Sequence, residues 1–108
     1  MDNRVTIAGR VVGTPQLRYS PAGVPITRFV LRHHSQRAHE GGLREVGCEL
    51  EVVASGALAK QAQALGEGAL VRASGYLARA SYRTSARFLV LHAEHLESGD
   101  SVPVAPDS

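Results

Sequence analysis

The chain has 108 residues, of which 44% are hydrophobic and 20% charged, so we expect one small globular domain and not two. No apolar run approaches the roughly 20 residues that a membrane-spanning helix needs. The start of the sequence lacks the layout of a secretory signal, and the single cysteine excludes an internal disulfide. These features predict a cytoplasmic protein without a membrane association.

The formal net charge is only +2, but the charges are unevenly distributed along the sequence. Eleven of the twelve basic residues are Arg. Residues 3–39 contain six Arg without any Asp or Glu, and residues 68–93 contain four Arg, again without an acid. This segregation is typical either of a mildly basic solvated surface or of a track for an anionic partner, and composition does not decide between the two.

The first half of the chain predicts three β-strands. Residues 4–13 alternate apolar and polar side chains, and Gly9 in their middle indicates a bend or bulge. Thr14-Pro15 is predicted to end this strand, and Ser20-Pro21-Ala22-Gly23 has the residue order of a tight turn. Two further strands are predicted at residues 24–35 and 45–54, with a flexible polar loop at residues 36–44 between them.

The second half predicts one helix and two strands. Ser55 is a suitable N-cap and Gly66 a suitable stop for a helix, in which an apolar stripe is formed by Leu58, Ala62 and Leu65. The two strands are predicted at residues 68–79 and 88–96, and the basic loop between them at residues 79–87. We expect a folded domain over residues 1–97 and a disordered tail over residues 98–108.

Three strands, a short helix and two strands are the element order of the oligonucleotide-binding (OB) fold. The predicted fold class is therefore all-β, a five-stranded Greek-key barrel with one short helix between strands three and four. This fold binds ligands across its second and third strands and with the loops that follow strands one and four. Those two loops are basic here and both contain Tyr, so charge and fold agree on a nucleic-acid-binding face.

The run from Gly13 to Phe29 resembles the first hairpin of bacterial single-stranded-DNA-binding proteins, and so do Val52–Gly56 and Gly68–Leu77. The resemblance covers residues 3–97. Within that superfamily, Asn3-Arg4-Val5, Ser20–Pro25 and the ending 89–95 are similar to the primosomal replication protein N (PriB) family. The long tail with an acidic, aromatic tip of general single-stranded-DNA-binding proteins is not seen in residues 98–108.

The resemblance implies a homodimeric, non-enzymatic OB-fold protein of replication restart that uses no cofactor. Its implied partners are single-stranded DNA, a PriA-type helicase that it stabilises on the fork, and a DnaT-type primosomal protein with the helicase loader. A protein-interaction scaffold with weak DNA binding, a general single-stranded-DNA-binding protein and an RNA-binding module are the alternatives.

Basic and aromatic residues are expected to form two walls of a DNA-binding groove, because Arg can fork onto phosphates and Tyr can stack on bases. The first wall comprises Arg18, Tyr19, Arg28, Arg32 and His34. The second comprises Tyr76, Arg79, Tyr82, Arg83 and Arg87. Part of these Arg is expected to be solvated or paired with acids instead, and we place Arg4, Arg10 and Arg72 in that class.

The sequence departs from the family pattern at Gly47, where better-known members have a stacking Trp. A base stacked on an aromatic ring contributes roughly 1–3 kcal/mol, so weaker DNA binding or other contacts are expected here. Phe29 and Phe88 are predicted to lie in the core, and Cys48 to be an inert core thiol.

The five His do not predict a metal site, because His92 and His95 are three residues apart on a strand and should face opposite sides. The strand at residues 88–96 is apolar on both faces at its start and should be covered on both sides. Together with Leu43, Val46 and Leu50, this apolar surface predicts a homodimer.

Overall fold

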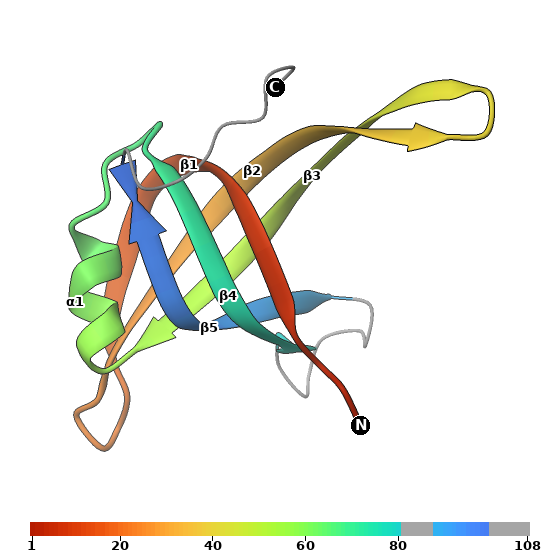
Figure 1. The fold of residues 1–108 in the computed structure, drawn as a ribbon. Helices are drawn as coiled ribbons and strands as arrows, with labels where there is room; N and C mark the ends of the chain where they lie inside the picture. The colour runs from red at the N-terminus through yellow and green to blue at the C-terminus, as the bar shows by residue number, and fades with distance from the viewer. Residues whose placement is uncertain (81–87, 100–108) are drawn as a thin grey trace.

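The computed structural model describes residues 1–80 and 88–99, and these form a closed β-barrel with one short helix (Figure 1). The elements are β1 (Val5–Tyr19), β2 (Pro25–His39), β3 (Gly42–Ser55), α1 (Ala57–Gln63), β4 (Leu70–Arg79) and β5 (Leu89–Ser98). The strands follow one another around the barrel in the order β1-β2-β3-β5-β4, with β3 and β5 parallel and all other neighbours antiparallel. The predicted OB-fold barrel with a helix between its third and fourth strands is confirmed.

β1 is longer than predicted, because it continues through Thr14-Pro15 instead of ending there. It pairs first with β4, over Val5–Arg10, and then with β2, over Arg10–Tyr19. The register with β2 shifts between Val12 and Gln16, so the backbone bulges at the proline, which has no N–H to give to the ladder.

Of the bend or bulge predicted at Gly9, the bulge is not formed, since Gly9 keeps its regular pairing with Val71 of β4. A Cβ atom at Gly9 would overlap the backbone carbonyl of Arg32, so glycine allows β1 and β2 to approach closely where β1 passes from β4 to β2. The turn predicted at residues 20–23 is confirmed by the hydrogen bond from the Gly23 N–H to the Ser20 carbonyl (2.8 Å).

The predicted loop at residues 36–44 is largely strand. β2 and β3 pair without interruption from Ile26↔Ser55 to His39↔Gly42, and only Glu40 and Gly41 form the turn. β2 leaves β1 after Arg32 and β3 meets β5 only at Val52 and Val53, so the far part of this hairpin projects from the barrel as a two-stranded arm, residues 33–48 (Figure 1).

The core fills the barrel with the apolar side chains that alternation predicts on one side of each strand. Phe29 is 3% exposed, which confirms its predicted place in the core. The core cluster comprises Val11, Phe29, Leu31, Val52, Ala54, Ala62, Val71, Ala73, Leu91 and Leu96.

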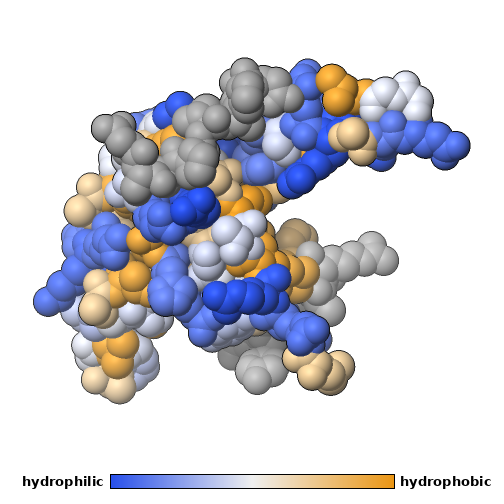
Figure 2. Space-filling view, in the orientation of Figure 1, coloured by the Kyte–Doolittle hydropathy of each residue, from blue (hydrophilic) through white to orange (hydrophobic). Residues whose placement is uncertain are grey.

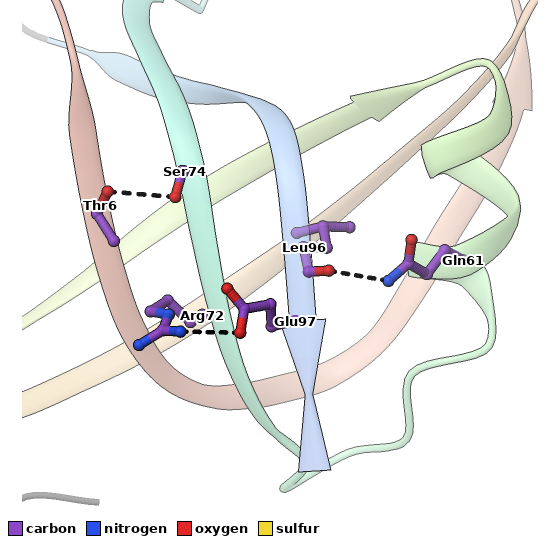
Figure 3. A network of polar contacts seen from close by, with 6 residues as sticks. All are labelled: Thr6, Gln61, Arg72, Ser74, Leu96 and Glu97. Carbon is purple, nitrogen blue, oxygen red and sulfur yellow. Dashed lines mark hydrogen bonds and ion pairs between the residues drawn. The ribbon is translucent and has the colours of Figure 1, made fainter. Parts of the chain in front are cut away.

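The helix packs against the barrel with Ala59 and Ala62, which are both fully buried, while Leu58 and Leu65 are partly buried against the core. The buried Thr27 hydroxyl donates to the Ala59 carbonyl (2.7 Å), and Gln61 donates to the Leu96 carbonyl (3.1 Å; Figure 3). These two bonds fix the helix to β2 and to β5.

The predicted helix boundaries are wrong at both ends. Ser55 is the last residue of β3, and the N-cap is Gly56, with φ 65° and no capping side chain. The helix ends at Gln63 and Gly66 does not stop it. A glycine N-cap lets the chain reverse directly from strand into helix, which the conformation of Ser does not permit as easily.

β5 corrects a prediction about side-chain burial. Val90 and Leu91 are both buried, but Phe88 is 65% exposed and Leu89 45%, so the start of this strand is not covered on both sides and Phe88 is not a core residue. β5 ends at Ser98, one residue after the expected end of the domain at residue 97. The rest of the predicted tail, 100–108, lies outside the described residues.

Across residues 1–80 and 88–99, no helix has the length and apolar character that crossing a membrane requires.

Candidate nucleic-acid interface

β2 turns its polar side chains outward, opposite the core. Phe29 and Leu31 are buried, whereas Arg28, Arg32 and His34 are exposed, as alternation predicts. These three side chains therefore share the outer face of the barrel with the neighbouring strands β1 and β3.

Pairing between strands extends this outer face into a row across all five strands. Gln16 of β1 pairs with Arg28 of β2, Arg28 pairs with Val53 of β3, Val53 with His92 of β5, and His92 with Tyr76 of β4. Paired residues point to the same side of a sheet. Arg28 and Tyr76, two predicted site residues that are far apart in the sequence, are thus joined by one row, which we call the outer row. Val53, which links them, is itself only 4% exposed.

A shallow groove lies at the Gln16 end of the outer row. It is lined by Gln16, Arg18, Tyr19, Ile26 and Arg28, and it continues along Thr14, Val30 and Glu51. Arg18 is exposed and has no ion-pair partner among the described residues, and Tyr19 is 67% exposed. The structure therefore brings Arg18, Tyr19 and Arg28 together, with one unpaired cation and one accessible ring.

Arg18 and Tyr19 were expected on a loop, but they lie at the end of β1, paired with Ile26 and Pro25. Their positions are consequently fixed by the sheet rather than by the short turn that follows.

Acidic side chains of β3 accompany the basic side chains of β2 on the outer face. Arg32 places Nε at 2.9 Å and Nη2 at 2.8 Å from one oxygen of Glu49. Arg28 Nη1 lies 3.7 Å from Glu51, and Nε2 of His34 lies 4.0 Å from Glu45. Charges that are segregated along the sequence are therefore interleaved in space.

The other end of the outer row is aromatic. The Tyr76 ring stacks on His92, with centroids 5.1 Å apart and an interplanar angle of 12°, and Tyr76 is 42% exposed. His92 is thus part of the candidate interface, although the sequence predicts no role for it there. The signal that would have found it is its alternation with buried Leu91.

The remaining predicted residues of the second wall are not brought to this row. Arg79 is exposed at the end of β4, three residues beyond Tyr76, and therefore on the opposite side of the strand. Tyr82, Arg83 and Arg87 lie outside the described residues.

Arg10 was expected away from the site, but it pairs with Arg32 and lies beside it on the outer face. Its Nη1 donates to the Gly68 carbonyl (3.2 Å). Arg72, by contrast, is held by Glu97 at 2.8 Å, as expected of a paired surface cation (Figure 3).

Gly47 lies on the arm opposite His34, and an added Cβ atom there would meet only the His33 carbonyl, at 3.7 Å. Cys48 is exposed, so the prediction of a core thiol is wrong. The face of β3 that points into the barrel at Val52 is open to solvent at Cys48, because the arm has left the barrel at that level. Much of the visible surface of the arm is hydrophilic (Figure 2).

His33 and His34 are consecutive residues of β2 and face opposite sides of the strand. His33 is partly buried, with Nδ1 2.7 Å from the Ala8 carbonyl, while His34 is exposed. The described residues hold no cluster of His, Cys, Asp or Glu suited to a metal ion.

Comparisons with known proteins match nearly the whole chain. A family model described as "another single-strand binding protein family" matches residues 3–95. The replication restart protein PriB of Erwinia tasmaniensis is 38% identical over 101 residues, which cover 92% of this chain and 95% of that protein. The protein of the same name from Photobacterium profundum is 38% identical over 104 residues, covering 93% of this chain and all of that protein.

Solved structures similar to this chain include a PriB protein and a single-stranded DNA binding protein. A structure of PriB from Ralstonia solanacearum superposes with a TM-score of 0.77 at 30% identity, covering 92% of this chain and 100% of that one. The single-stranded DNA binding protein of Thermus aquaticus superposes with a TM-score of 0.75 at 25% identity, and the match covers 91% of this chain and 50% of that one.

Proposed function

Because the chain belongs to the PriB family of single-strand binding proteins, we propose that it binds single-stranded DNA across the outer row of its barrel and acts in replication restart. The family is one of DNA-binding proteins and not of enzymes, in agreement with the prediction from sequence. The proposal is carried by one observation above all, the register that aligns Arg28 with the Tyr76–His92 stack through Val53.

The residues of the outer row suit an extended strand of DNA. Arg18 and Arg28 bind phosphates in the groove at the β1 end, where Tyr19 offers a ring for a base. Tyr76 of β4 offers a second ring for a base, and one face of this ring is stacked on His92 of β5. Arg32 and His34 extend the track toward the arm. Arg79, Tyr82, Arg83 and Arg87 remain predicted DNA contacts; Arg79 lies off the outer row, and the other three lie outside the described residues.

Within this function we propose the finer role that the relatives' name suggests, in the bacterial cytoplasm. The protein holds a PriA-type helicase on single-stranded DNA as a homodimer, and with a DnaT-type protein helps to bring in the helicase loader. The exposed Leu43 at the end of the arm and the exposed Phe88 and Leu89 supply apolar surface for such protein contacts.

The test is fluorescence anisotropy with a labelled dT oligomer at several salt concentrations, with and without a PriA-type helicase. We expect binding whose log–log salt slope is about −0.7 for each neutralised phosphate, and tighter binding when the helicase is present. Absence of binding at low salt rejects the DNA role, and tighter binding to oligo-U than to dT assigns an RNA ligand instead.

A protein-interaction scaffold with weak DNA binding is the second candidate, favoured by the pairing of Arg28, Arg32 and His34 with acids of β3. Capture of the helicase by this protein, with no measurable affinity for dT, is the result that selects the scaffold. Light scattering distinguishes the proposed homodimer from a monomer at micromolar concentration.

A further inference from the structure

The outer face carries as many acids on β3 as it carries bases on β2, and the two sets are matched in position. Glu49 is directly opposite Arg32 in the register, and Glu51 is diagonal to Arg28. All four side chains are exposed to at least 39%, so each of them can also reach a ligand that lies on this face.

The Arg32–Glu49 pair has the tightest geometry of these contacts. Two nitrogens of the guanidinium, Nε and Nη2, converge on Oε2 of Glu49 at 2.9 and 2.8 Å. This uses the same donor fork that would otherwise hold a phosphate. Arg10, beside Arg32 in the register, is turned to the Gly68 carbonyl, so Glu49 is the anion that neutralises Arg32.

An ion pair this exposed contributes little to stability, and a phosphate can displace the carboxylate. The displaced carboxylate then lies beside the phosphate and takes up a cation from solution. Binding at Arg32 therefore releases fewer ions overall than binding at an unpaired Arg such as Arg18.

Resting on the proposed function, we propose that Glu49 is an affinity-setting residue that competes with DNA phosphates for Arg32, and that Glu51 does the same more weakly at Arg28. The acids of β3 thereby restrict tight phosphate binding to the β1 end of the outer row. Removal of the Glu49 charge opens a further phosphate position at the centre of the sheet.

The decisive variant is Glu49→Gln, which keeps an acceptor oxygen for Arg32 and removes the charge. We expect dT affinity to rise by up to about fivefold, and the salt slope to steepen by about 0.7. The matched control is Glu97→Gln, which makes the same charge change at the Arg72–Glu97 contact of 2.8 Å, away from the outer row. We expect that control to leave the slope unchanged.

A second background separates competition from simple repulsion. If Glu49 acts by holding Arg32, the gain from Glu49→Gln disappears when Arg32 is replaced by Ala. An equal gain with and without Arg32, or an equal gain from Glu97→Gln, overturns the proposal.

The two proposals fail separately. If the wild-type chain binds dT and Glu49→Gln binds no tighter, only the role of Glu49 is rejected. If the wild type does not bind dT but the double variant that carries both Glu49→Gln and Glu51→Gln does, the acids mask the site. That result supports the role of Glu49. If neither chain binds dT at low salt, both proposals are rejected.

Discussion

At Gly9, strands β1 and β2 approach too closely for any side chain. A Cβ atom there would overlap the carbonyl of Arg32, which is backbone and cannot swing away. We therefore expect Gly9→Ala to lower the free energy of unfolding by about 2 kcal/mol, measured by urea denaturation.

The control for that change is Gly66→Ala, because Gly66 has open space around its Cα and needs no left-handed backbone. Its free energy of unfolding should change by less than about 0.5 kcal/mol. Equal destabilisation by both substitutions would contradict the close approach of β1 and β2.

Gly47 lies on the arm at the position where the family resemblance predicts a stacking Trp. Since a Cβ atom is accommodated there, Gly47→Trp should fold normally and should bind dT more tightly by about 1–3 kcal/mol through base stacking. Anisotropy gives the affinity, and Gln63→Trp, on the exposed side of α1, is the control that should not change it. If the dT affinity of Gly47→Trp is unchanged, the expectation that bound DNA contacts the arm is contradicted.

For a single residue, the alternation of apolar and polar side chains predicts which side of a strand it occupies, but not how far along the barrel it lies. Phe29 and His34 are on the predicted sides. Cys48 lies on a strand that passes beyond the core, and Phe88 directly precedes β5, so these side chains, which were expected to be buried, are exposed. Depth depends on where neighbouring strands end, which is a tertiary property.

The helix is the smallest element, and its seven residues depend on contacts with the barrel. Thr27→Val removes the buried hydroxyl that donates to the Ala59 carbonyl at 2.7 Å, and should destabilise the protein by about 1 kcal/mol in urea denaturation. Thr6→Val is the control, since the Thr6 hydroxyl bonds at an exposed position, and it should have a smaller effect. A larger effect of Thr6→Val would mean that the helix is held by packing alone.

The elements themselves were predicted in number and order, because period-two alternation and Gly/Pro turns are local signals. Their ends were not. Thr14-Pro15 was expected to end a strand, but a bulge absorbs it, and the polar residues 36–44 were expected in a loop, but they continue a hairpin. In both places pairing with a partner strand overrides local preference.

For the molecule as a whole, the distribution of charge along the chain was a poor guide to its distribution in space. The acid-free stretch 3–39 supplies β2, and the acids at residues 45–51 supply β3, yet these strands are neighbours and their charges pair across the outer face. Part of the candidate interface, including Arg28 and Tyr76, was identified from sequence. His92 and Arg10 required the register between strands.

The central claim is that single-stranded DNA binds across the outer row, and one set of titrations tests it most directly. One double variant carries Arg18→Ala and Arg28→Ala, and the other carries Lys60→Ala and Arg72→Ala. The dT affinity and the salt slope of the two are compared. Each double variant removes one acid-paired cation and one cation that has no ion pair within residues 1–80 and 88–99. We predict that the first pair loses roughly tenfold or more in affinity and between about 0.7 and about 1.4 in slope, while the second leaves the slope unchanged. Equal losses from both pairs, or no loss from the first, would contradict the account.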